Sequence, residues 1–140
     1  MSFFTWSEEY VIGVEPSDRQ HERLFGIMCE LQAAIAEGRS TPDVSSLIAC
    51  LKDYTITHFT QEENLMLHCQ FPLLRQHQTE HAVFVKKIVV FAERCTQGDQ
   101  AMSLELLSFL RNWLLHHILK IDRAYVPYVV GKQIAQIPQG

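Results

Sequence analysis

The sequence lacks several features that would assign it to a common functional class. Its 140 residues carry a formal net charge of -4, with no basic run, which argues against a nucleic-acid-binding surface or a polybasic membrane anchor. The first residues, MSFFTWSEEY, have neither the positive start nor the long apolar core of a signal peptide. No apolar run approaches the about 18 residues that a membrane-spanning helix needs. We therefore expect a cytoplasmic protein that has no membrane span and no nucleic-acid partner.

Closely spaced cysteine pairs are also missing. Cys29, Cys50, Cys69 and Cys95 are scattered and form no CxxC motif, so we expect reduced thiols. The chain has no internal repeat, low-complexity run or linker, and its length suits one domain with a substantial core. We predict a single domain that covers residues 1–140.

Four long segments show helical periodicity, and they are predicted at about residues 18–37, 42–67, 72–97 and 102–122. Residues 1–16 precede them as an apolar, aromatic arm that we expect to pack on the helices. Short loops between long helices imply neighbours that run in opposite directions. The prediction is an all-α, up-down-up-down antiparallel four-helix bundle with an N-terminal arm and a short C-terminal tail.

The expected helix ends rest on capping residues and helix breakers. Ser17 is a candidate N-cap of the first helix, and Thr41 is a capping residue that precedes a proline at the start of the second. After the fourth helix, Pro127, Gly131 and Pro138 are expected to break long helices. We expect the apolar tail, residues 124–137, to pack back on the bundle, with the docking of a partner as the alternative.

Each predicted helix places polar groups on the seam that faces the bundle core. Such a seam consists of residues spaced three or four apart, and in the second helix it reads Leu47, Leu51, Tyr54, His58, Glu62 and Leu65. Across the four helices the polar members are His21, His58, Glu62, His77, His81 and His117, with Asp122 beside the last seam. Every one of these side chains is capable of binding a metal ion.

These seven groups are expected to lie at one level of the bundle. In an antiparallel bundle the starts of the first and third helices lie level with the ends of the second and fourth. His21, His77 and His81 come near helix starts, and the other four groups come near helix ends. Topology and spacing therefore predict one slab of five imidazoles and two carboxylates at one end of the core.

Burial of these groups without partners would be very costly. An unpaired buried polar group costs roughly 2–7 kcal/mol, and an ionised carboxylate costs far more. Hydrogen bonds among the seven groups are one solution, but the geometry is awkward. The set exceeds the four ligands of a structural zinc site and fits two metal ions that share the carboxylates. Imidazole with carboxylate suits iron, although zinc and copper also accept imidazole.

Other polar and aromatic residues fit plainer roles. His116 lies about 100° round the helix from its neighbour in the seam, and we expect a surface position or a supporting one. His68, at a helix end, and Glu63 are expected to be solvated. A lone core histidine is more often hydrogen-bonded than metal-bound, so the metal hypothesis depends on the convergence of all seven groups. Trp6, Trp113 and the phenylalanines are expected to be plain core.

The motifs together resemble the hemerythrin family, in particular its single-domain bacteriohemerythrins. The resemblance rests on DRQHERLF (18–25), HFTQEENLM (58–66), HQTEH (77–81) and WLLHHILKID (113–122), with the tryptophan and the IGV of the arm. It spans nearly the whole chain. Ser17 departs from the pattern, since the family usually has isoleucine before DxQH.

The resemblance implies a non-haem di-iron centre with an oxide or hydroxide bridge. Carried onto this chain, one iron takes His77, His81 and His117, and the other takes His21 and His58 and keeps an open position for O2. Glu62 and Asp122 would bridge the two irons. Leu114 and Trp113 would form the O2 pocket, with Leu114 as plain core filler the alternative.

The implied function is reversible O2 binding for storage or delivery, without catalysis. Two alternatives stay open. One is a di-iron enzyme with peroxide, nitric oxide or iron-oxidation chemistry, and the other is an O2 sensor that acts through a partner. Ferritin-like di-iron enzymes use four glutamates and two histidines, and this set is richer in histidine. We expect a monomer, with O2 as ligand and at most a transient contact with an O2-consuming enzyme.

Overall fold

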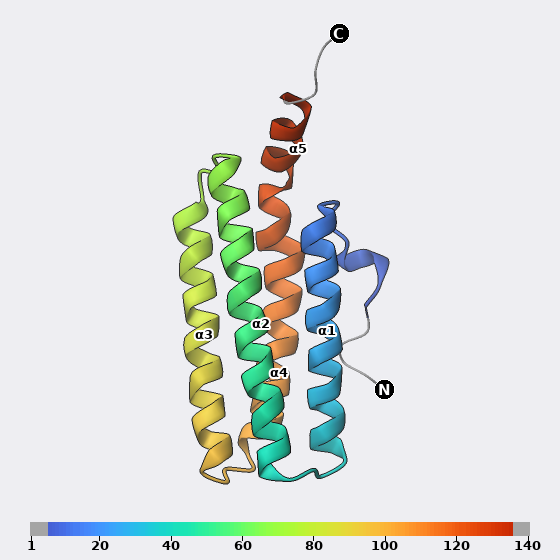
Figure 1. Ribbon diagram of the computed structural model, residues 1–140, viewed down its shortest axis with the longest axis vertical. Coiled ribbons are helices and arrows are strands. Elements are labelled where there is room, and N and C mark those ends of the chain that lie inside the picture. Colours follow the sequence, from blue (N-terminus) through green and yellow to red (C-terminus); the bar gives the residue numbers. More distant parts are fainter. Residues whose placement is uncertain (1–5, 136–140) are drawn as a thin grey trace.

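The structure confirms the predicted four-helix bundle. The computed structural model describes residues 6–135, and of residues 115 and 132–135 only the backbone. The long helices are α1 (Glu15–Ala36), α2 (Thr41–His68), α3 (Leu74–Thr96) and α4 (Met102–His116). Each runs opposite to the one before it, so that the α1–α2 and α3–α4 turns lie at one end and the α2–α3 turn at the other (Figure 1). α2 packs against α1 and α3, and α4 packs against α3 and α1.

The core is built from the apolar seams of all four helices. Residues with almost no exposed surface come from each helix: Leu24, Met28, Leu31, Ile48, Leu51, Phe84, Ile88, Leu106 and Leu110. Burial of a side chain of this size stabilises the fold by about 1.5–3 kcal/mol. No helix between residues 6 and 135 combines the length and the apolar composition that a bilayer crossing requires.

Two predicted helix starts need correction. Ser17 is not the N-cap of α1, because the helix begins at Glu15 and its N-cap is Val14. Pro16 fits the first turn, where a backbone N–H has no partner within the helix, and Ser17 is therefore buried inside the helix. In α2 the N-cap is Ser40 rather than Thr41, and its Oγ accepts a bond from the Asp43 N–H.

The end of α1 follows the predicted stop. Gly38 has a φ of +66°, a left-handed conformation that glycine adopts without a steric penalty. The N–H of Arg39 then reaches back to the carbonyl of Ala34, which closes the last turn of the helix in the manner of a Schellman motif. The short connection to α2 can therefore reverse the chain direction.

The chain after α4 stays helical, contrary to the expected break at Pro127. A π-helical turn, η2 (His117–Ile121), and a 3-10 turn, η3 (Asp122–Tyr125), lead into α5 (Val126–Ala135). Pro127 is the second residue of α5, where proline is tolerated, and Gly131 lies within that helix. α5 continues the line of α4 beyond the ends of the other helices (Figure 1), yet Val129 is buried. The expected breaker Pro138 lies outside the described residues.

The N-terminal arm packs on α1 through its aromatic side chains. The ring of Trp6 lies edge-on to that of Phe25, with centroids 5.2 Å apart, and Tyr10 contacts the same ring. The carboxylate of Asp18 accepts bonds from the N–H groups of Ile12 and Gly13 at 2.8 and 3.1 Å. Asp18 thus joins the arm to the first turn of α1, which fixes the start of the helix that carries His21.

Candidate metal centre

His21, near the start of α1, points into the bundle. The apolar residues that follow it, Leu24 and Met28, are three and seven positions further on and are also buried. These spacings place all three side chains on one face of an α-helix. The imidazole of His21 is buried and its Nε2 lies 3.1 Å from Asp122 Oδ2.

α2 supplies a histidine and a carboxylate one turn apart. His58 and Glu62 are spaced i, i+4, so both side chains project from the same face. Both are buried, and His58 Nε2 lies 3.6 Å from Glu62 Oε2. Phe59, next to His58, is also buried and turns toward α3 and α4, where its ring contacts those of Phe84 and Trp113.

α3 supplies two histidines, also one turn apart. His77 and His81 are buried on the inward face, and their ring centroids are 4.6 Å apart. Their Nε2 atoms lie 3.0 and 3.1 Å from the same oxygen, Glu62 Oε1. The ring of Phe59 stacks on His81 with centroids 3.7 Å apart and an interplanar angle of 3°, which fixes the orientation of this imidazole.

The π-helical turn explains how His117 and Asp122 face the same point. Five residues along a regular α-helix correspond to a rotation of about 500°, which would leave the two side chains about 140° apart. In η2 each backbone hydrogen bond joins residues five apart rather than four. The turn is therefore wider, and the side chain of Asp122 lies on the same face of the helix as that of His117. His117 Nε2 lies 2.9 Å from Asp122 Oδ1, and both residues are buried.

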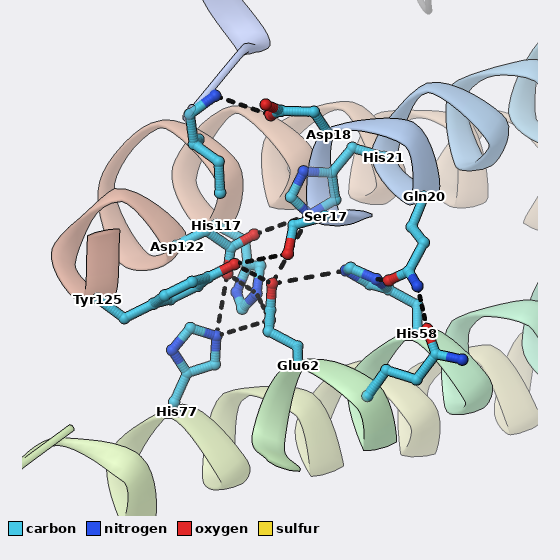
Figure 2. A network of polar contacts seen from close by, with 12 residues as sticks. Ser17, Asp18, Gln20, His21, His58, Glu62, His77, His117, Asp122 and Tyr125 are labelled. Carbon is cyan, nitrogen blue, oxygen red and sulfur yellow. Dashed lines mark hydrogen bonds and ion pairs between the residues drawn. The ribbon is translucent and has the colours of Figure 1, made fainter. Parts of the chain in front are cut away.

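The structure brings all seven predicted side chains together, and they divide into two groups. In each group the nitrogen or oxygen atoms lie within 4.8 Å of one another. One group contains His77, His81 and His117 with both carboxylates, and the other contains His21 and His58 with both carboxylates. Figure 2 shows six of the seven, His81 excepted, pointing toward a common centre from α1, α2, α3 and the chain beyond α4.

The two carboxylates lie between the groups, each with one oxygen toward either side. Glu62 Oε1 and Asp122 Oδ1 face the three-histidine group, at 3.0 Å from His77 Nε2 in both cases. Glu62 Oε2 and Asp122 Oδ2 face the two-histidine group, at 3.8 and 3.1 Å from His21 Nε2. This is the arrangement that two metal ions with shared carboxylates would need.

Both carboxylates are held in the ionised form. Burial raises the pKa of Glu62, but hydrogen bonds from His117, His77 and His81 outweigh it and hold the pKa well below its usual value. Burial and the nearby charge of Glu62 oppose the ionised form of Asp122, and the contacts with His117 and His21 again lower the pKa. Ionised carboxylates are the form that binds a metal ion.

The imidazoles differ in charge when no metal is bound. Burial lowers the pKa of His58 to about 4, so this ring is neutral near pH 7. Burial also opposes protonation of His117, but Asp122 and Glu62 outweigh it and raise the pKa to about 10. The same carboxylates raise the pKa of His77. The protonated imidazole of His117 thus offsets part of the carboxylate charge in the metal-free centre, and a metal ion would displace its proton.

Several buried atoms at the centre have no hydrogen bond within the described part of the chain. They are His21 Nδ1 and Nε2, His58 Nε2, His77 Nδ1, His117 Nδ1, and both oxygens of Asp122. Some of these atoms lie close to an oppositely charged group, as Asp122 Oδ1 does to His117 Nε2, but the angles at the two atoms do not suit a hydrogen bond. Buried polar atoms are normally satisfied. Unsatisfied Nε2 and carboxylate atoms that converge on one point are therefore suited to metal ions.

Aromatic and apolar side chains close the centre on the side of the bundle core. Trp113 stacks on His117 with ring centroids 4.2 Å apart and an interplanar angle of 12°. Besides packing in the core, it therefore contacts one of the candidate metal ligands directly. Leu114 lies one turn before His117 and is 2% exposed. That these two residues line a pocket for a bound gas stays a prediction.

The residues that support this set were not predicted from the sequence. Glu63, expected to be a solvated neighbour, accepts a 2.8 Å hydrogen bond from His81 Nδ1 and is only partly exposed. Gln20 accepts a bond from His58 Nδ1, and Tyr125 reaches Glu62 from the end of the bundle. Gln20 and Glu63 each directly adjoin one of the seven residues in the chain, which was the one signal available. His116 and His68 are exposed, as expected.

Comparison with known proteins gives a consistent result. The family model described as the hemerythrin HHE cation binding domain matches residues 13–129. A bacteriohemerythrin of Stenotrophomonas maltophilia (strain R551-3) is 32% identical over 129 residues, which are 92% of this chain and 83% of that protein. A bacteriohemerythrin of Clostridium acetobutylicum is 31% identical and covers 88% of this chain and 98% of its own.

Solved structures agree in fold. The crystal structure of a wild-type hemerythrin superimposes with a TM-score of 0.79 at 27% sequence identity, and it covers 89% of this chain and 96% of that one. A hemerythrin variant gives a TM-score of 0.81 at 26% identity, over 92% of this chain and 98% of that one.

Proposed function

Because the chain belongs to the hemerythrin family, we propose that it binds O2 reversibly at a non-haem di-iron centre, for oxygen storage or delivery rather than catalysis. The observation that carries this proposal is the unequal division of the imidazoles. Three lie on one side of two shared carboxylates and two lie on the other. An ion on the two-histidine side would have one protein ligand fewer, and thus a position available for a small exogenous molecule.

In this proposal His77, His81 and His117 would hold one iron and His21 and His58 the other, and both irons would share the carboxylates of Glu62 and Asp122. Iron is preferred because imidazole and carboxylate together suit it. Two ferrous ions would bring four positive charges against two carboxylates, and a bridging hydroxide would leave the site nearly neutral, as its burial requires.

Bound iron would supply the electrons and the open position that O2 requires, and the chain would supply fixed ligands and a dry surrounding. The stacked rings of Phe59 and Trp113 restrict the orientations of His81 and His117. Leu114 follows Trp113 in the chain, is buried, and would keep water from the open position. The set also has two carboxylates rather than the four of ferritin-like oxidases, which leaves fewer ligands able to shift during turnover.

Absorption spectroscopy of the reconstituted protein tests the proposal. Reduced protein is exposed to air, then deoxygenated, and iron is counted per chain. We expect two irons and a visible ligand-to-metal charge-transfer band that appears with air and disappears on deoxygenation. Fewer than two irons after reconstitution would refute the di-iron centre. Irreversible oxidation with turnover of an added substrate would favour the enzyme instead.

A further inference from the structure

Two of the five imidazoles are anchored by side chains on their outward-facing nitrogens. His58 Nδ1–H donates to Gln20 Oε1, and His81 Nδ1–H donates to Glu63 Oε2 at 2.8 Å. The Nδ1 atoms of His21, His77 and His117 have no hydrogen-bond partner among residues 6–135. His58 belongs to the two-histidine group and His81 to the three-histidine group, so each half of the centre has one anchored imidazole.

The two anchors differ in charge but are similar in size. On the two-histidine side the partner is the neutral amide of Gln20, whose Nε2 also donates to Oε1 of Gln61 on α2. Figure 2 shows Gln20 reaching from α1 to the ring of His58. On the three-histidine side the partner is the carboxylate of Glu63, whose side chain is 26% exposed.

A negative acceptor changes the donor strength of an imidazole more than a neutral one does. A carboxylate on Nδ1–H makes the bond charge-assisted and raises the basicity of the opposite nitrogen, and loss of such a partner typically weakens metal binding 10–100-fold. Glu80 adds to the asymmetry, because its Oε2 lies 3.9 Å from His117 Nδ1. Both charged neighbours thus act on the three-histidine half.

We propose that Glu63 and Gln20 are positioning residues that make the two halves unequal, so that the metal ion of the three-histidine half is held more tightly than that of the two-histidine half. This inference rests on the proposed di-iron function. The stronger donor set would also stabilise the oxidised state of its ion. The weaker half, which keeps the open position, would hold the more electron-poor ion.

Two near-isosteric exchanges test the inference, Glu63→Gln and Gln20→Glu. Protein loaded anaerobically with Fe(II) is titrated with a ferrous chelator, which gives two successive dissociation constants. In the wild type we expect the constants to differ at least about tenfold. Glu63→Gln should weaken the tighter site by about 10–100-fold, and Gln20→Glu should tighten the weaker one by a similar factor. The midpoint potential should rise in the first variant and fall in the second.

A His58→Ala background identifies the half on which each residue acts. That variant retains the three-histidine half, so Glu63→Gln should still weaken iron binding there, whereas Gln20→Glu should have no imidazole to act on. Exposed Glu30→Gln and Gln100→Glu are matched controls for the change in net charge. Far-UV circular dichroism reports whether each variant folds.

The possible results separate the two proposals. A wild-type protein that binds fewer than two irons refutes the proposed function itself. Two irons with equal constants, or constants that Glu63→Gln and Gln20→Glu leave unchanged, overturn the inference alone. Equal shifts in the two control variants would assign the effect to net charge and would overturn it as well.

Discussion

Replacement of Tyr125 by phenylalanine should destabilise the protein measurably although no ligand is removed. The Tyr125 hydroxyl lies 3.1 Å from Glu62 Oε2 and 3.0 Å from Ser17 Oγ. Burial, and then the charges of Glu62 and Asp122, raise the pKa of Tyr125, so the phenol keeps its proton. Because a carboxylate can only accept, that proton is donated to Glu62, and the Ser17 hydroxyl donates to the phenol oxygen.

The size of the effect follows from the two lost bonds. A hydrogen bond to a charged group contributes about 1.5–3 kcal/mol, and a neutral one contributes about 1 kcal/mol. The ring of Tyr125 stays in place, so no cavity term is added. We expect Tyr125→Phe to reduce the free energy of unfolding by roughly 2–4 kcal/mol. At about 3 °C per kcal/mol for a chain of this length, the melting temperature should fall by roughly 6–12 °C.

Thermal unfolding of the protein as purified, followed by circular dichroism, measures this change. Ser17→Ala and the double variant complete a thermodynamic cycle. In the double variant the buried Ser17 hydroxyl is gone, so we expect it to lose about 1 kcal/mol less than the sum of the single variants. Equal melting temperatures for Tyr125→Phe and wild type, or strict additivity in the cycle, would refute this account of the contact.

Four further predictions concern the pocket, the charge balance and the core. Leu114→Ala should speed autoxidation, since water would reach the open position, and an unchanged rate in stopped-flow absorbance would remove that role. Metal loading of stripped protein near pH 7 should release protons, because His117 has a pKa raised to about 10; a pH indicator in weak buffer detects this, and no release would contradict it. Since that pKa is raised, the stabilisation from His117 in stripped protein is fully present below about pH 6.5 and is lost as the pH rises to about 10, which urea unfolding across that range checks. Phe84→Ala should cost about 3–5 kcal/mol in denaturant unfolding, and a loss below 1 kcal/mol would contradict its burial in the core.

Much of the fold was predictable because the seam residues repeat with helical spacing over four long segments. The helix ends were less so. Ser17 has the chemistry of an N-cap, but Pro16 fits the first turn equally well and the helix starts before it. The continuation through Pro127 was missed for a related reason, because proline is compatible with the first turn of a new helix and not only with the end of an old one.

The seven polar groups were predictable because five imidazoles and two carboxylates on apolar seams need a common explanation. Their supporting residues were not, because Gln20 and Glu63 lie beside the seam and look like ordinary surface residues. Whether they reach His58 and His81 depends on helix rotation and on side-chain rotamers, which periodicity does not define. Tyr125 was missed because the path of the chain beyond Asp122 depends on the π-helical turn.

That turn has a consequence for how the chain can change over evolutionary time. It accommodates one more residue than a regular α-helical turn and still leaves the later side chains on the face they need. A single deletion between His117 and Asp122 would leave the two residues four positions apart, a rotation of about 400° in a regular α-helix, and so would keep both side chains on one face. A single insertion would instead add a rotation of about 100° and turn Asp122 away from the centre, and Tyr125 and Val129 away from their buried positions. The stretch can thus lose the π-helical turn together with one residue, whereas one added residue would disrupt the centre and the C-terminal helix in one step.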